Sequence, residues 1–80
     1  MDKSNIDFSR GDEDIVFIHA NLDTEELSEA EDPEEKLELE MKDKGLEWEN
    51  AYLIGLFKDE FSLMLQEDAE IKLDGETVNL

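Results

Sequence analysis

The chain has no cysteine, one proline and one histidine among its 80 residues, and only seven of its residues are lysine or arginine. The absence of cysteine excludes disulfide bonds, thiolate metal sites and cysteine nucleophiles. The single histidine, His19, has no second histidine or cysteine with which to bind a metal ion, so we expect a structural role for it. No stretch approaches the ~18 apolar residues of a membrane span, and residues 1–8 lack the apolar core of a secretory signal. We therefore expect a cytoplasmic protein without membrane contact.

Motifs of catalysis and metal binding are missing as well. The sequence contains no glycine-rich phosphate loop, no His-Glu-x-x-His and no nucleophile elbow. Acid-base catalysis by a pair such as Glu38 and Glu40 needs a shielded pocket that makes one carboxylate an acid and the other a base. The acidic run at 12–14 lacks the alternating ligands of a calcium loop. We expect no enzymatic activity, no cofactor and no metal site.

Charge is the most unusual property of the sequence. Its 25 aspartate and glutamate residues against seven basic ones give a formal net charge of -18 at pH 7. Thirteen of these carboxylates, with three lysines, lie between residues 23 and 49, whereas residues 51–66 have a net charge of only -1. Such a charge repels nucleic acid and anionic lipid and attracts basic proteins. With 39% hydrophobic residues, the chain still has enough apolar material to form a folded unit.

The beginning of the chain predicts a lead-in followed by one domain. Residues 1–14 are polar and acidic, which predicts a flexible lead-in, although Ile6 and Phe8 alternate as in a short edge strand. Residues 15–21 begin with β-branched and aromatic side chains, which is typical of a central strand covered on both faces. We assign residues 15–80 to a single α+β domain.

The acidic segment that follows predicts a short helix. Residues 23–31 form this helix or an acidic loop, with Asp23 or Thr24 as the cap and two glutamates in the first turn. Pro33 is expected to end the segment.

Two further elements are predicted from alternation and turn chemistry. Residues 36–42 alternate apolar and charged side chains, which predicts a half-exposed strand. Near the C-terminus, Asp74 and Gly75 are typical of a two-residue hairpin turn, because both tolerate a positive φ angle. A hairpin over residues 70–80 would place Ile71 opposite Val78.

Residues 51–66 hold most of the large apolar side chains. Read at about 100° per residue, they leave only a narrow polar stripe, which predicts an amphipathic helix over residues 50–66. The competing interpretation is two strands, 51–57 and 61–66, around a turn at 58–60, and the alternation of the second half supports it. We prefer the helix, because the helical template accounts for nearly all of the positions.

The predicted fold is therefore α+β, with a small antiparallel sheet of about four strands packed on one major amphipathic helix that Asn50 caps. The apolar side chains of this helix would cover more than half of its circumference, and a small sheet would cover only one side of that apolar surface. The remaining side is expected to meet another segment, a target or a second copy of the chain. A homodimer through this helix is one expectation.

Regularly spaced carboxylates suit the imitation of a phosphate backbone. Side chains two apart on a strand lie about 6.7 Å apart, those three or four apart on a helix lie about 5 to 6 Å apart, and successive phosphates rise about 3.4 Å. The pattern predicts a non-catalytic inhibitor that mimics nucleic-acid phosphates and blocks the basic cleft of a DNA- or RNA-binding protein. The predicted partner-binding residues are Glu25, Glu26, Glu29, Glu31, Asp32, Glu34, Glu35, Glu38 and Glu40.

In size and charge the chain resembles the small acidic decoy proteins of phages and mobile elements, which include inhibitors of restriction, repair and CRISPR nucleases. No motif matches a particular member. The resemblance implies action in the host cytoplasm, through contact with a basic nucleic-acid-binding protein and not with nucleic acid itself.

Two other interpretations remain open. The first is an acidic adaptor, subunit or immunity-type protein that binds a basic partner without nucleic-acid mimicry, which the apolar arc around Phe57, Phe61 and Met64 favours. A decoy should be displaced by duplex DNA or RNA, whereas an apolar-centred interface should not. The second is adaptation to a salty cytosol, which predicts folding that collapses below about 0.5 M salt.

Overall fold

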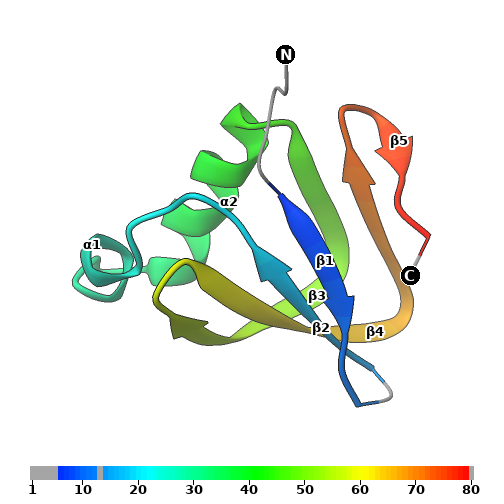
Figure 1. The fold of residues 1–80 in the computed structure, drawn as a ribbon, viewed down its shortest axis with the longest axis horizontal. Coiled ribbons are helices and arrows are strands. Elements are labelled where there is room, and N and C mark those ends of the chain that lie inside the picture. Colours follow the sequence, from blue (N-terminus) through cyan, green and yellow to red (C-terminus); the bar gives the residue numbers. More distant parts are fainter. Residues whose placement is uncertain (1–5, 13, 80) are drawn as a thin grey trace.

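A computed structural model describes residues 6–12 and 14–79 of the chain. These residues form strands and two helices in an α+β arrangement (Figure 1). The elements are β1 (Asp7–Arg10), β2 (Ile15–His19), α1 (Thr24–Ser28), α2 (Pro33–Asp43), β3 (Leu46–Phe57), β4 (Glu60–Leu73) and β5 (Glu76–Thr77).

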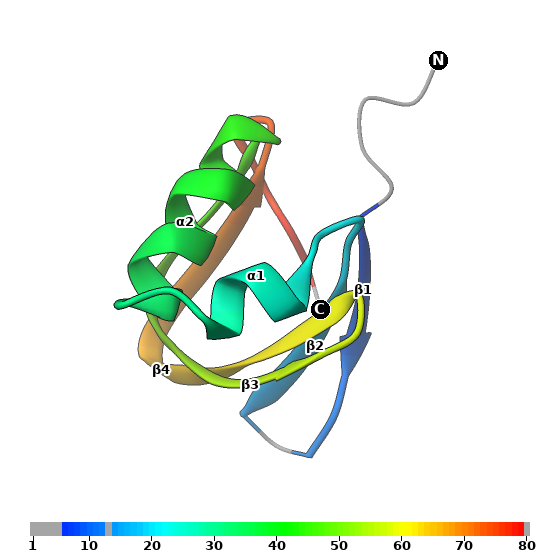
Figure 2. The same ribbon diagram turned by 90° about the vertical axis from the view of Figure 1, so that its left-hand side faces the viewer.

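The strands make one antiparallel sheet of five strands in the order β1-β2-β4-β3, and β5 pairs with the end of β4. Both helices lie on the same, concave side of this curved sheet (Figure 2). No described helix covers the opposite face. The predicted α+β class and small antiparallel sheet are confirmed. Neither of the described helices combines the length and apolarity that crossing a membrane would require.

Strand β2 shows why the core lies on the concave side. Val16 and Ile18 are fully buried, whereas Phe17 and His19, which alternate with them, are exposed. The strand is central, between β1 and β4, as predicted. The expectation that both of its faces are covered is wrong, because nothing in the described chain packs over the second face. The core comprises Val16, Ile18, Ala20, Leu22, Leu27, Leu37, Met41, Leu46, Ala51, Phe61, Leu63 and Ile71.

The predicted helix over residues 50–66 is wrong. The segment forms the end of β3 and the start of β4, joined by a turn in which Lys58 has a φ angle of 55°. The alternative of two strands is the correct one. Leu53 pairs with Leu63, which also pairs with Val16 of β2. Phe61 likewise pairs with both neighbouring strands, so the hairpin is stabilised by a strand far away in sequence.

Asn50 does not cap a helix but bends the hairpin. Its φ angle is 55°, and its Nδ2 atom donates to the carbonyl oxygen of Asp68 over 3.1 Å. On either side of it, Glu49 pairs with Glu70 and Ala51 with Leu65. One residue of β3 therefore stands against four of β4, a local bulge that turns the strand pair sharply. Figure 1 shows this bend in β4.

The predicted strand over residues 36–42 is also wrong, since these residues belong to α2. Leu37 and Met41, four residues apart, are buried together, and Leu39 between them is 66% exposed. Asp32 caps the helix by accepting from the backbone N–H of Glu35 over 3.2 Å. Pro33, expected to end the preceding segment, instead occupies the first turn of α2. A proline there is favourable, because its missing N–H has no partner inside the helix.

The remaining predictions concern α1 and the two ends of the chain. Asp23 caps α1, within the predicted range 23–31. The hairpin turn at Asp74 and Gly75 is confirmed, and the N–H of Val78 donates to the carbonyl oxygen of Ile71 over 2.8 Å. Of the predicted lead-in over residues 1–14, residues 1–5 and 13 lie outside the described part of the chain, as does Leu80 of the predicted hairpin.

The cap of α2 yields a stability test. Replacing Asp32 by alanine should lower the free energy of unfolding by about 1 kcal/mol relative to Glu31→Ala, measured by urea denaturation. Both variants remove one negative charge, and the Glu31 side chain makes no hydrogen bond to a described residue. Asp32→Asn, which keeps a capping oxygen, should behave like the parent protein. Equal stabilities of Asp32→Ala and Glu31→Ala would contradict the assigned helix start.

Candidate acidic interface

The nine predicted partner-binding residues lie on or between the two helices. Glu25 and Glu26 belong to α1, and Glu34, Glu35, Glu38 and Glu40 to α2. Glu29, Glu31 and Asp32 lie in the short connection between the helices. Seven of the nine are exposed, and Glu34 and Glu40 are half-buried.

Three of these carboxylates have partners inside the protein. Asp32 is the cap of α2. An Oε of Glu34 accepts from the backbone N–H of Leu53 over 3.2 Å, which ties α2 to β3. Glu26 lies 3.9 Å from the Nζ atom of Lys36 in an exposed ion pair, which contributes little to stability. Within the described chain, the other six carboxylates make no hydrogen bond or ion pair, so their full charge is available to a partner.

The predicted pairing of Glu38 with Glu40 on one face of a strand is wrong. Two residues on a helix are separated by about 200° around its axis, so these side chains leave α2 on different sides. Glu38 lines a groove beside β3, whereas Glu40 lines a shallow hollow formed with residues 21–25, Lys58 and Asp59. Glu35 and Glu38, three apart on the helix, are the pair that shares a surface.

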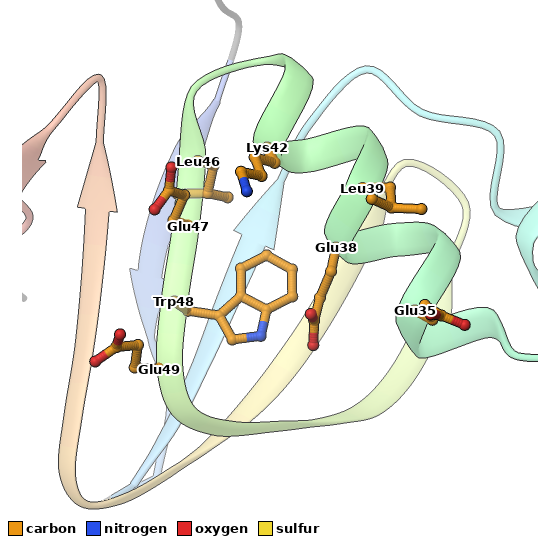
Figure 3. Close-up of a pocket in the computed structure, with 8 residues that line it drawn as sticks. All are labelled: Glu35, Glu38, Leu39, Lys42, Leu46, Glu47, Trp48 and Glu49. Carbon is orange, nitrogen blue, oxygen red and sulfur yellow. The ribbon is translucent and has the colours of Figure 1, made fainter.

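This surface is a groove between α2 and β3, with a volume of about 310 Å³. Figure 3 shows Trp48 between the two elements, with the carboxylate of Glu38 beside its indole ring. The carboxylates of Glu47 and Glu49 leave β3 on the side away from Trp48, the side chain of Glu35 points away from β3, and Lys42 lies near one end of the groove. The lining residues are Glu35, Glu38, Leu39, Lys42, Leu46, Glu47, Trp48 and Glu49.

The fixed position of Trp48 makes the groove floor rigid. Its ring packs on Phe61 of the core, with the ring centroids 5.6 Å apart. Its Nε1 atom is buried and finds no hydrogen-bond acceptor among the described residues. The groove therefore combines an aromatic surface with carboxylates, the two features that favour lysine and arginine side chains.

Glu47 and Glu49 were not among the predicted site residues. The sequence carries a signal for them, because Leu46, Glu47, Trp48 and Glu49 alternate apolar and acidic side chains as in a strand. The structure confirms that alternation, with Leu46 buried and both glutamates exposed. What the sequence does not show is that α2 lies alongside β3.

Among the described residues, no three acidic or histidine side chains are placed to hold a metal ion.

Comparisons of the chain with protein-family models, with curated proteins and with solved structures gave no match.

The bond from Leu53 to Glu34 yields a second stability test. Glu34→Ala should lower the free energy of unfolding by about 1 kcal/mol and speed hydrogen exchange at the Leu53 amide, because this N–H loses its acceptor. Glu35→Ala is the matched control, since it removes the same charge one residue away from an exposed position. If the two variants were equally stable and equally protected at Leu53, Glu34 would not anchor α2 to the sheet.

Proposed function

We propose that the protein is a non-catalytic acidic inhibitor that occupies the basic cleft of a DNA- or RNA-binding protein, with its carboxylates in the place of nucleic-acid phosphates. The observation that carries the proposal is the groove between α2 and β3, where Glu38 lies beside the Trp48 ring and Glu35, Glu47 and Glu49 are among the lining residues. The acidic residues around this groove favour a lysine or arginine side chain and disfavour a nucleotide, whose phosphates are negatively charged. The target would supply lysine or arginine residues already arranged for phosphates.

The helices support the proposal because they hold the charges in a fixed arrangement. Each helix begins at an aspartate cap, and α2 is anchored to the core by Leu37 and Met41. Carboxylates that are already held in fixed positions lose little freedom on binding, which lowers the entropic cost of association. The net charge of -18 adds long-range attraction toward a basic surface and speeds encounter at low salt.

The proposed contact set differs from the nine residues predicted from the sequence. Its centre is the groove set of Glu35, Glu38, Glu47 and Glu49, and Glu25, Glu29 and Glu31 extend it toward α1. Asp32 and Glu34 are excluded because their carboxylates stabilise the fold.

An acidic adaptor, subunit or immunity-type protein is the second candidate. It is favoured by the exposed apolar side chains of β2, β3 and β4, which a phosphate mimic does not require. The two functions differ in whether nucleic acid competes for the partner.

The test is capture from a cell lysate on the immobilised protein at about 50 mM salt. If the protein is a decoy, duplex DNA or RNA added at constant ionic strength should release the captured protein. The released protein should then lose its own nucleic-acid binding when one equivalent of inhibitor is added. Captured proteins that nucleic acid does not displace, or that still bind it in the complex, would contradict the proposal and favour the adaptor.

Paired charge variants locate the contact. Glu35→Gln with Glu38→Gln should weaken binding to the captured protein by about tenfold or more and flatten its salt dependence, because both carboxylates line the groove. Glu67→Gln with Glu76→Gln is the matched control, since it removes the same charge from exposed positions of β4 and β5 outside the groove. Equal weakening by both pairs would mean that only net charge matters and that the groove is not the contact.

A further inference from the structure

The uncovered, convex face of the sheet carries an apolar surface that the proposed function does not use. Side chains alternate across each strand, so the register identifies which of them share this face. Tyr52, Phe57, Phe17 and Met64 are 57%, 69%, 36% and 36% exposed. In three rows across β2, β4 and β3, the face consists of Ile15, Met64 and Tyr52, then Phe17, Ser62 and Gly55, then His19, Glu60 and Phe57.

The middle row forms a hollow between aromatic walls. Phe17 and Phe57 line it, Gly55 and Ser62 form part of its floor, and its volume is about 240 Å³. Gly55 is not one of the residues with a positive φ angle, so the backbone does not require glycine there. A β-carbon at Gly55 would point into this space, 3.0 Å from the Oγ atom of Ser62. Glycine inside a strand weakens the strand, and it often marks a place where another molecule approaches closely.

The face is also the least acidic part of the molecule. The segment 51–66, which provides most of it, has a net charge of only -1. Lys58 lies next to it, with Nζ 5.4 Å from the centroid of the Phe57 ring. Helices α1 and α2, whose sequences are rich in glutamate, lie on the opposite side of the sheet (Figure 2). Most of the helical carboxylates and the apolar surface thus lie on different sides of the sheet, although Glu60 and, in β1, Asp7 share the face with His19.

We propose that this face binds the same face of a second copy of the chain. Two sheets pack about 10 Å apart, and a helix layer outside each sheet would put the two acidic layers about 30 Å apart. The Debye length at physiological salt is about 8 Å, so the repulsion between the two acidic helix layers is small in this arrangement. The aromatic walls and the hollow suit a symmetric contact, in which each copy supplies both a projection and a space.

The dimer would give the protein two acidic surfaces facing away from each other. Each could engage one basic cleft, and two linked contacts raise the overall affinity without any new interaction. The dimer does not depend on the phosphate-mimic proposal, because the face that forms it carries none of the groove residues.

Sedimentation analysis from about 1 to 300 µM tests the dimer directly. The mass should rise from one chain to two over this range. Raising the salt from about 0.15 to 0.5 M should shift the midpoint to lower concentration, because salt screens the repulsion between two copies of charge -18. A chain that stays monomeric at the highest concentration in both salts would overturn the proposal and leave the face to another partner.

Matched variants locate the interface. Met64→Lys should raise the dissociation constant of the dimer at least about tenfold, because it buries a charge in the contact. Leu39→Lys makes the same chemical change at a side chain that is 66% exposed on α2, and it should leave the constant within about twofold. Phe57→Lys, at a 69% exposed position, repeats the test at a site where the fold tolerates a charge. A dimer that resists both face variants, or that Leu39→Lys weakens equally, would place the interface elsewhere.

Discussion

The pairing of β4 with β2 on one side and β3 on the other is the interaction on which the rest of the structure depends. Leu63 is opposite Val16 and Leu53, and Phe61 is opposite Ile18 and Leu56. These pairs create the concave apolar surface that Leu37 and Met41 of α2 cover. The position of α2 in turn places Glu38 beside Trp48 of the edge strand β3. Without the sheet, the carboxylates would have no common surface.

The acidic residues act on stability in two opposite ways. Their mutual repulsion destabilises a compact state, and only two ion pairs are found between described side chains to offset it. Locally, however, Asp23 and Asp32 cap the helices, and glutamates occupy both first turns, where the helix dipole favours negative charge. Glu38, Glu47 and Glu49 lie outside these positions and have no such structural use. Their position at a groove with an aromatic floor is what makes them candidates for binding.

The sequence predicted the local elements well where one signal was unopposed. Strand β2 and the hairpin turn at Asp74 were of this kind, whereas the cap of α1 was left open between Asp23 and Thr24. For residues 36–42, Leu37 and Met41 fit both a strand and a helix, the alternation with Leu39 favoured the strand, and the Asp-Pro start of the helix was interpreted as the end of the preceding segment. That start fixes the helix, because Asp32 and Pro33 together satisfy its first turn.

The secondary structure of residues 51–66 could not be predicted from the local pattern, because the contacts that decide it come from β2, more than 40 residues earlier. The wide apolar arc that looked like one side of a helix is in fact two faces of a hairpin. One face is the core, and the other carries Tyr52, Phe57 and Met64. The acidic character of the site was visible in the sequence, but the groove was not, since it requires α2 and β3 to lie side by side.

Amide hydrogen exchange with backbone NMR at low ionic strength tests the central claim most directly, namely that this sheet fixes the acidic helices in one place. We expect cross-strand contacts between Leu53 and Leu63, helical contacts through residues 33–43, and slow exchange at the amides of Leu37 and Met41. Helical contacts through residues 51–66, or rapid exchange throughout residues 23–43, would contradict it.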